Sequence, residues 1–459
     1  MSGSTASPKS PLSASTRARR LAAGKALRAH VPRSSHAAWS PSPDRPDPVD
    51  VLAASDRRRL PQLVPIRYGR MSLSPFAFLR GAAALMARDL AGGPRTGIRV
   101  QLAGDAHLGN FGIFATPERD RVFDVNDFDE TLPGPWEWDV KRLATSLVLV
   151  GRQNGCSPAE SRRAARAAVR SYRQLMGRFA TMRYLDTWYS HIDLDSVSRL
   201  VPRAGRKAIG RAMARARRRT GLHAFPHLTE AVRGRFRIRD EPPLIVHYAD
   251  PVDAEAARSF YDRYLASLPD ERRMLLERYH LVDVAQKVVG VGSVGTACSV
   301  MLLMGDGDVE DPLFLQLKQA LPSVLEPYAG ASPYRNHAQR VVTGQHLIQE
   351  SSDAFLGWGT MRSRDVYVRQ LRDMKFSADV TALGPKALAG QGELCGSALA
   401  RAHARTGDPA EISGYLGDRD LFDRAIVRFA EAYADQTERD HAALCKAIRR
   451  GRVDARVDL

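Results

Sequence analysis

Two short segments carry polar residues where the surrounding pattern predicts buried β-strands. They are "QLAGDAHLGNFGIF" (residues 101–114) and "RVFDVNDFDET" (residues 121–131). Buried carboxylates are costly unless they are paired, hydrogen-bonded or bound to a metal ion. The fold must therefore bring partners to these groups. The polar residues concerned are Asp105, His107, Asn110, Asp124, Asp127 and Asp129.

The spacing of these residues indicates phosphoryl-transfer chemistry. In a catalytic loop of this kind an Asp, here Asp105, accepts or orients the proton of an attacking hydroxyl, and an Asn five residues later, here Asn110, holds a metal ion. Asp127, at the end of the second strand, is placed to hold Mg²⁺, with Asp129 or Asp124 beside it. The predicted catalytic residues are Asp105 and His107, and the predicted metal ligands are Asn110, Asp127 and Asp129.

The combined string resembles a kinase motif. "GDAHLGN" at 104–110, followed by "DFD" at 127–129, is similar to the "HGDxHxGN … DF/W-acid" pattern of the aminoglycoside and choline kinase branch of the protein-kinase-like superfamily. Ala103 replaces the usual first His. In that branch a later Asp opens a helix, and Asp139 stands in a comparable place, although it fits a simple helix cap equally well. The resemblance implies a kinase-like fold with ATP and Mg²⁺ as ligands.

A third segment supplies residues suited to binding phosphates. "KVVGVGSVGTACSV" (287–300) contains a GxGxxG pattern, which alone also opens Rossmann helices, but the residues after it are strand-like. "LFLQLKQA" (313–320) then places Lys318 in an apolar strand, as in kinases, although such a Lys can also simply snorkel. Its acidic or polar partner stays open among Glu326, Gln345 and Glu350. The predicted nucleotide-binding residues are Gly290, Gly292, Ser293, Gly295 and Lys318.

These parts stand in a permuted order compared with kinases, because the catalytic loop precedes the glycine-rich loop. Permutation is physically permissible, since chain termini are often close in space. We therefore predict an α+β, protein-kinase-like two-lobed fold in circularly permuted order. Its predicted parts are a disordered basic tail (1–45), a helical lobe with the catalytic loop and metal-binding strand (46–280), a β-rich lobe with the glycine-rich loop and Lys strand (281–380), and C-terminal helices packing on the helical lobe (381–459). Within the helical lobe, "SPFAFLRGAAALMARDLA" predicts a helix capped by Ser72 or Ser74.

The formal net charge of +17 is concentrated in two segments. Residues 1–60 hold eleven Lys and Arg against four Asp, and residues 203–219 hold eight Lys and Arg without an acid. Few aromatic residues accompany them, so we expect a solvated tail and a solvated helix face and not a nucleic-acid site. No apolar run approaches the roughly 20 residues that span a bilayer. With no secretory signal and four scattered cysteines, the chain is expected to be cytoplasmic, without a membrane partner.

At the level of the whole chain, several strings are specific. "LVPIRYGRMSLSPFAFLRGAA", "GDAHLGNFG", "FDVNDFDETLPGPWEWDVKRLA" and "VYVRQLRDMK" resemble the bacterial family catalogued as domain of unknown function 2252. The resemblance runs from about residue 25 to about residue 450. Since that family name implies no activity, the kinase-like prediction rests on the motifs above.

The predicted function is an ATP- and Mg²⁺-dependent phosphotransferase acting on an unknown hydroxyl acceptor. Its partners would be the nucleotide and that acceptor. One alternative is a catalytically inactive kinase-like module that binds nucleotide. Another is a metal-dependent phosphohydrolase, which suits the Asp, His and Asn set but lacks the further GDxxDRG and GNHE motifs. Arg369 and Arg372 either line the cleft or are solvated on an edge strand.

Overall fold

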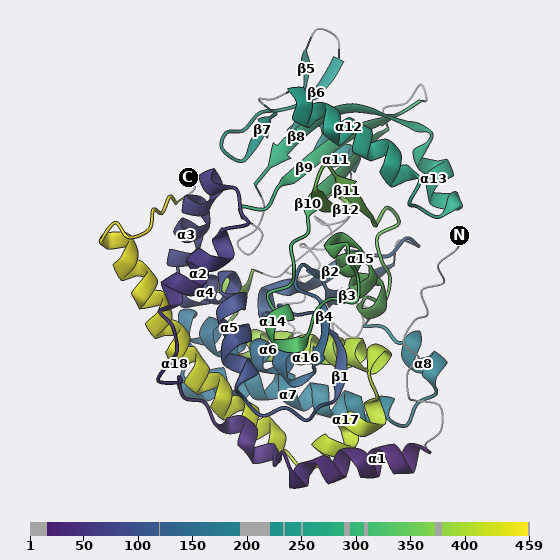
Figure 1. The fold of residues 1–459 in the computed structure, drawn as a ribbon. Helices are drawn as coiled ribbons and strands as arrows, with labels where there is room; N and C mark the ends of the chain where they lie inside the picture. Colours follow the sequence, from purple (N-terminus) through teal and green to yellow (C-terminus); the bar gives the residue numbers. More distant parts are fainter. Residues whose placement is uncertain are drawn as a thin grey trace.

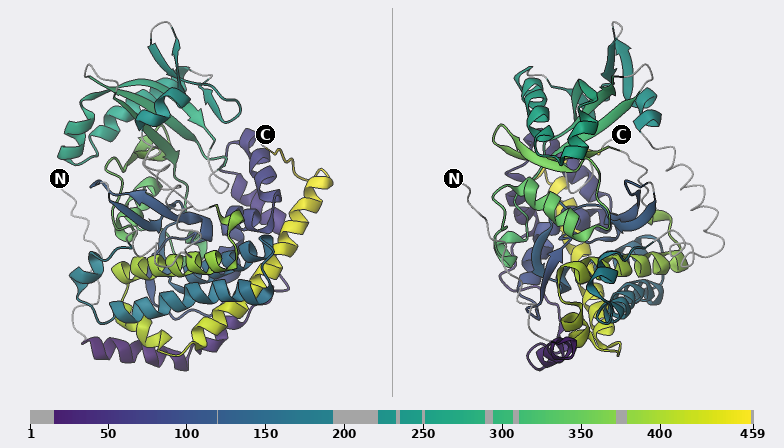
Figure 2. Two further views of the ribbon diagram at one scale, coloured as in Figure 1. Left: turned by 180° about the vertical axis from the view of Figure 1, so that it is seen from behind. Right: turned by 90° about the vertical axis from the view of Figure 1, so that its right-hand side faces the viewer.

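The chain folds into a sheet lobe and a helical lobe, which lie at the top and bottom of Figure 1 and stay separate in both views of Figure 2. The fold is α+β, as predicted. The computed structural model describes residues 16–118, 120–192, 221–232, 235–248, 251–288, 294–306, 311–371 and 379–457. The basic segment 203–219, the glycine-rich positions 290, 292 and 293, and Arg372 lie outside these ranges.

The sheet lobe is built on six antiparallel strands in the order β11-β12-β10-β9-β8-β7. Alternate residues of β10 face opposite sides: Leu315 packs in one cluster with Phe260 of α12, and Phe314 packs in another with Phe225 of α11. The two helices therefore cover opposite faces. The elements are α11 (Gly221–Leu228), β7 (Ile245–His247), α12 (Pro251–Leu265), α13 (Asp270–Leu276), β8 (Tyr279–Lys287), β9 (Cys298–Gly305), β10 (Pro312–Gln319), β11 (Gly357–Met361) and β12 (Arg364–Gln370).

The sheet lobe begins earlier than the sequence indicated. We expected helical structure up to about residue 280, but three strands lie before that residue: β5 (Thr229–Val232), β6 (Arg235–Ile238) and β7. These strands are three or four residues long. Segments that short carry too little periodicity to be separated from a helix.

The helical lobe surrounds α6, most of whose residues are buried. Helices α7, α16 and α18 pack against it, and Trp136 and Trp138 lie in this core. The helices are α1 (Arg17–Ala26), α2 (Pro48–Asp56), α3 (Val64–Ser72), α4 (Pro75–Gly81), α5 (Ala83–Ala91), α6 (Glu137–Gln153), α7 (Pro158–Phe179), α8 (Tyr184–Trp188), α14 (Glu326–Ala329), α15 (His337–Ile348), α16 (Pro385–Thr406), α17 (Pro409–Leu416) and α18 (Leu421–Arg449). Short 3-10 helices are η2 (Leu27–Ala29), η3 (Arg33–Ala37), η4 (Pro61–Leu63), η5 (Leu108–Asn110) and η6 (Val380–Ala382). Within the described ranges, none of the helices has the length and apolar character needed to cross a bilayer.

The prediction of disorder for residues 1–45 is wrong for residues 16–45. Helix α1 lies beside α17 at the base of the molecule (Figure 1). Gly24 permits this approach, because a Cβ there would lie 1.9 Å from the carbonyl oxygen of Glu411. His36 is fully buried and its Nε2 lies 2.8 Å from the Tyr415 hydroxyl. Composition predicted disorder because it treats the segment alone, whereas its apolar partners come from the other end of the chain.

The predicted helix over residues 74–91 is interrupted at Ala82, where the backbone has φ −109° and ψ 34°. Ser74 caps its first part, α4, by accepting a hydrogen bond from the Ala77 amide at 3.1 Å. At the interruption the Gly81 carbonyl accepts a hydrogen bond from Arg67 at 2.6 Å. A side chain from α3 thus satisfies a carbonyl group at the end of α4.

Two small antiparallel strand pairs bring the acidic segments together. Strand β1 (Arg99–Leu102) pairs with β4 (Leu132–Pro135), and β2 (Phe111–Ala115) pairs with β3 (Arg121–Val125). The loop after β1 and the loop after β3 therefore lie side by side. The Asn126 amide donates to the Asn110 carbonyl at 2.8 Å, which ties the two loops together.

Candidate functional site

A small cleft forms where these two loops meet the end of β10. Its volume is about 60 Å³, which is room for several water molecules. Its charged lining has two signs: carboxylates on the loops, and guanidinium groups from the segment that leads through α3 and α4. These residues are Asp105, Asp127, Asp129 and Glu130 on the acidic side, and Arg59, Arg67 and Arg80 on the basic side.

Lys318 and Asp129 connect the two lobes at this cleft. The Lys318 Nζ lies 2.8 Å from Asp129 Oδ2, and the Tyr367 hydroxyl donates to Asp129 Oδ1 at 2.5 Å. Burial alone would lower the pKa of Lys318, but Asp129 outweighs it and the pKa lies above its ordinary value. Lys318 is therefore a buried, paired cation and not a snorkelling side chain.

The expected partners of Lys318 have other contacts. Glu326 lies 3.6 Å from His337, and Gln345 donates to Gln349 at 2.7 Å. Glu350 lies 3.7 Å from His191. None of the three is the partner, because Asp129, in the loop after β3, takes that role.

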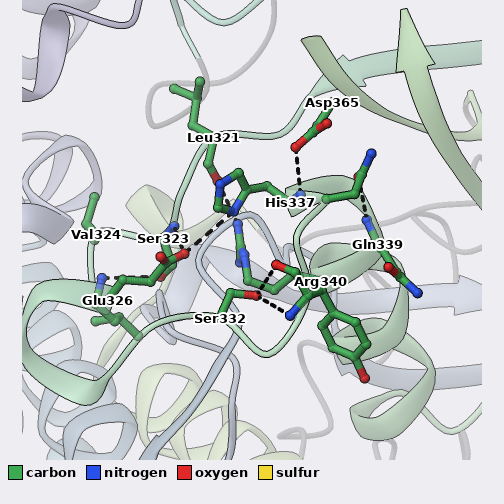
Figure 3. A network of polar contacts seen from close by, with 12 residues as sticks. Leu321, Ser323, Val324, Glu326, Ser332, His337, Gln339, Arg340 and Asp365 are labelled. Atoms are coloured by element: carbon green, nitrogen blue, oxygen red, sulfur yellow. Dashed lines mark hydrogen bonds and ion pairs between the residues drawn. The ribbon is translucent and has the colours of Figure 1, made fainter. Parts of the chain in front are cut away.

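Helix α15 contributes an arginine where an acidic residue was expected. Arg340 donates to the carbonyl oxygens of Asp129, Thr131 and Leu321 at 2.9, 2.6 and 2.8 Å. Figure 3 shows Arg340 among the residues that follow β10, with Asp365 bound to the His337 amide nearby. The guanidinium thus joins the loop carrying Asp129 to the chain just after Lys318.

Asp105 faces the cleft and forms an ion pair with Arg142 of α6. Burial raises the pKa of Asp105, Arg142 opposes that rise, and Asp127 adds to it. Its backbone carbonyl accepts hydrogen bonds from the Asn110 side-chain amide and the His107 backbone amide, both at 2.8 Å. The loop is therefore rigidly held around its carboxylate.

His107 contacts its own loop and does not line the cleft. Its Nδ1 accepts a hydrogen bond from the Gly109 amide at 3.1 Å, and its Nε2 lies 3.7 Å from Asp105 Oδ2. Burial, with Arg80 and Arg142 nearby, lowers the pKa of His107 well below its ordinary value. A neutral imidazole that orients the loop fits these contacts.

Asn110, a predicted metal ligand, and Asp124, an alternative one, do not line the cleft. Asn110 is buried in the loop, where its amide nitrogen binds the Asp105 carbonyl, and it does not line the cavity. Asp124 is fully buried and pairs with Arg401. Among the residues that the structure describes, no group of three or more His, Cys, Asp or Glu side chains is arranged to hold a metal ion. Asp127 and Asp129 both line the cleft, and their role as metal ligands stays a prediction.

Asp139 supports the start of the predicted catalytic loop. In the first turn of α6 it accepts hydrogen bonds from the amides of Ala103 and Gly104 at 2.7 and 3.0 Å. The Oδ2 of Asp139 also lies 3.3 Å from Nε2 of His403. The other ring nitrogen of His403, Nδ1, lies 2.9 Å from the Tyr172 hydroxyl. Asp139 therefore does not act as the cap of α6, since Trp136 occupies that position.

The arginines of the cleft were not singled out from the sequence. Arg80 has a buried Nε without a hydrogen-bond partner among the described residues, and Asp105 and Asp127 are the nearby opposing charges. Arg67 donates to Asp56 at 2.7 Å. The only available signal was that Arg67 and Arg80 fall within the string at 63–83 quoted above.

One predicted glycine-loop residue can be placed. Gly295, with φ +93°, lies against Arg59, and its carbonyl accepts a hydrogen bond from the Leu60 amide at 2.6 Å. Arg59 also donates to the Val294 carbonyl at 2.6 Å. Gly290, Gly292 and Ser293 lie outside the described residues. The end of the predicted loop is thus held at the cleft by a segment from the helical lobe.

Arg369 lies on an inner strand, because β12 sits between β11 and β10. The interpretation of a solvated edge-strand arginine is therefore wrong. Arg369 donates to the Gln316 side chain at 3.1 Å, on the same face of the sheet as Lys318.

Comparison with known proteins gives a family but no function. No curated protein and no solved structure matches this chain. One family model, described as "Uncharacterized protein conserved in bacteria (DUF2252)", matches residues 59–447. This range includes all the charged residues that line the cleft, and the chain belongs to that family.

Proposed function

We propose that this protein is an ATP- and Mg²⁺-dependent phosphotransferase with a kinase-like, circularly permuted arrangement of its parts. One observation carries the proposal: Asp105, Asp127 and Asp129 share a cleft with the end of the strand that bears Lys318, nearly two hundred residues away. A nucleotide kinase needs these four groups together. The order of these elements along the chain also fits, because the glycine-containing connection joins β8 to β9, the Lys lies on the next strand and α15 follows.

Each group has a role in this proposal. Asp105 accepts the proton of the acceptor hydroxyl. At the same time the oxygen of that hydroxyl bonds to the terminal phosphorus of ATP, and the bond from this phosphorus to the leaving diphosphate breaks. Arg142 and His107 hold Asp105 in place. Lys318 and Arg80 supply positive charge to the phosphates, and the buried Nε of Arg80, which has no hydrogen-bond partner within the described part of the chain, is available for this contact.

The residues present fit a magnesium–phosphate group. Mg²⁺ is usually held by one or two carboxylates together with substrate phosphates and water, so Asp127 and Asp129 suffice and a closed protein cage is not needed. Bound there, the ion would neutralise phosphate charge during transfer. Asn110 is not included, because its amide holds the loop.

The cleft as it stands accommodates a phosphate-sized group, since its volume is about 60 Å³. Complete small-molecule ligands occupy pockets of roughly 300–1,000 Å³. The cleft alone therefore holds only the phosphate end of a nucleotide, and the base and ribose must lie outside it. Binding of phosphate and metal there would open the Lys318–Asp129 contact, which frees both groups to engage these ligands.

The test is isothermal titration of ATP in the presence and absence of Mg²⁺. We expect Mg²⁺-dependent binding that weakens by at least about tenfold in Asp127→Asn, which removes one charge from the cleft. Asp127 is suitable because its hydrogen bond is local: its Oδ1 accepts one from the Asp129 amide at 3.3 Å. Asp120→Asn is the matched control, since Asp120 is exposed on the β2–β3 turn. Equal binding by both variants, or no binding of millimolar ATP by the wild type, would sink the proposal.

A further inference from the structure

A second and much larger cavity adjoins the cleft. It lies at the end of the sheet where β8 and β9 are connected, and its volume is about 840 Å³. That is within the roughly 300–1,000 Å³ of sites for small organic molecules. Thr296 lines both cavities, so a ligand of the second cavity would lie next to Asp105 and Asp127 of the first.

The walls of this cavity are mainly apolar and come from both lobes. Leu63 and Ile66, from η4 and α3, face the cavity together with Leu244, Val246 and Met361 of the sheet lobe. Apolar walls of this size favour a ligand with a sizeable hydrophobic body, because burying its surface is the main source of affinity.

The charges around the cavity have a single sign. Lys287, Arg362, Arg364 and Arg456 line it, and none of its described lining residues is acidic. The turn that carries Arg362 and Arg364 has φ +54° at Arg362, the one described residue other than glycine with a positive φ. A left-handed backbone is uncommon for such a side chain and marks a position worth functional attention.

We propose that this cavity binds a small organic anion with an apolar body, and that this anion is the phosphate acceptor. The role as acceptor rests on the proposed function, whereas anion binding stands without it. A nucleotide with its phosphates in the cleft would extend only its uncharged base and ribose toward the second cavity. The nucleotide would therefore bring no negative charge to Arg364 and Arg456. An anionic acceptor would place a negative charge beside these two residues.

Two matched fluorescent probes test the proposal: 8-anilinonaphthalene-1-sulfonate, which is anionic, and N-phenyl-1-naphthylamine, which has a similar body without charge. We expect the double variant Arg364→Gln/Arg456→Gln to weaken binding of the anionic probe by about tenfold and to leave the neutral probe unchanged. Leu63→Trp, which fills the cavity, should weaken both. The control is Arg163→Gln/Arg450→Gln, which removes the same charge from exposed positions away from the cavity.

The outcomes separate this proposal from the preceding one. Equal loss of the anionic probe in both double variants, or no effect of either, would overturn anion selection by this cavity. Displacement of the anionic probe by Mg²⁺ and ATP in simple competition would make the cavity part of the nucleotide site and overturn the acceptor assignment. Probe binding that persists in Asp127→Asn, while Mg²⁺-dependent ATP binding is lost, supports both proposals. Probe binding without any ATP binding retains the anion site and removes the kinase together with the acceptor role that rests on it.

Discussion

Lys318 of strand β10 and Asp129 of the loop after β3 form an ion pair across the two lobes, with 2.8 Å between Nζ and Oδ2. The two partners differ in environment: the Lys318 side chain is 2% exposed and the Asp129 side chain 26%. Breaking a buried ion pair is costly chiefly because it leaves one charge buried without a partner. The cost should therefore depend on which partner is removed.

The first prediction is an asymmetry between two variants. Asp129→Asn leaves the buried ammonium unpaired and should destabilise the fold by about 3 kcal/mol. Lys318→Met leaves a partly exposed carboxylate that keeps its bond from Tyr367, and should cost less, about 1 kcal/mol. Urea unfolding of both variants and of the double variant measures the difference and the coupling. Equal losses that add in the double variant would show that the pair contributes nothing of its own.

The second prediction concerns Gly104, which precedes Asp105. It has φ +84°, and a Cβ there would lie 2.2 Å from the Glu130 carbonyl oxygen. Gly104→Ala should therefore destabilise the fold by roughly 3 kcal/mol or more, because backbone strain and a backbone clash combine. Gly155 is the control: it has φ +72° but nothing within 4 Å of a Cβ, so Gly155→Ala should cost only about 1 kcal/mol. Similar unfolding midpoints for the two variants would contradict the close approach of the loops.

The sequence identified the cleft through residues that are close in the chain. The strings at 104–110 and 127–129 could be predicted, because each is a local pattern with a chemical reason. Lys318 was found because a lysine inside an apolar strand is unusual. Its partner was missed, because the prediction searched the following helix, while Asp129 reaches it through the pairing of β3 with β2 and of β4 with β1.

Residues whose role depends on tertiary packing were beyond sequence reasoning. Arg142 and Arg340 lie on helices, where arginine is a common residue, so the sequence gives no sign of their role. Only the packing of the fold brings Arg142 to Asp105 and Arg340 to the Asp129 carbonyl. The N-terminal helix was missed for the same reason, since its burial is supplied by α17. The residues of the predicted catalytic loop could be named from the sequence, but the side chains that support the loop could not.

The third prediction tests the support beneath the loop. Asp139→Ala removes the acceptor for the amides of Ala103 and Gly104 and should raise their hydrogen-exchange rates, with a loss of about 2 kcal/mol in stability. Asp408→Ala is the control, because Asp408 accepts two amides at the start of α17 in the same way. If the loop amides exchange equally fast in both variants, Asp139 does not hold the loop.

The last prediction is a pH dependence that originates at Glu350. Burial raises the pKa of this carboxyl from 4.5 to about 7, although Arg401 and His191 oppose the rise. Between pH 4.5 and 7 the folded protein therefore keeps a proton that the unfolded chain has lost, so this group stabilises the fold at low pH and that contribution is lost as pH rises. The loss is at most about 3.5 kcal/mol, since the pKa rises by about 2.5 and each pKa unit corresponds to about 1.4 kcal/mol. Urea unfolding at pH 5 and pH 7 should give a smaller decrease for Glu350→Gln than for the wild type, because the amide does not titrate. An equal decrease in the two proteins would mean that Glu350 is ionised throughout and that its charge is already neutralised by Arg401.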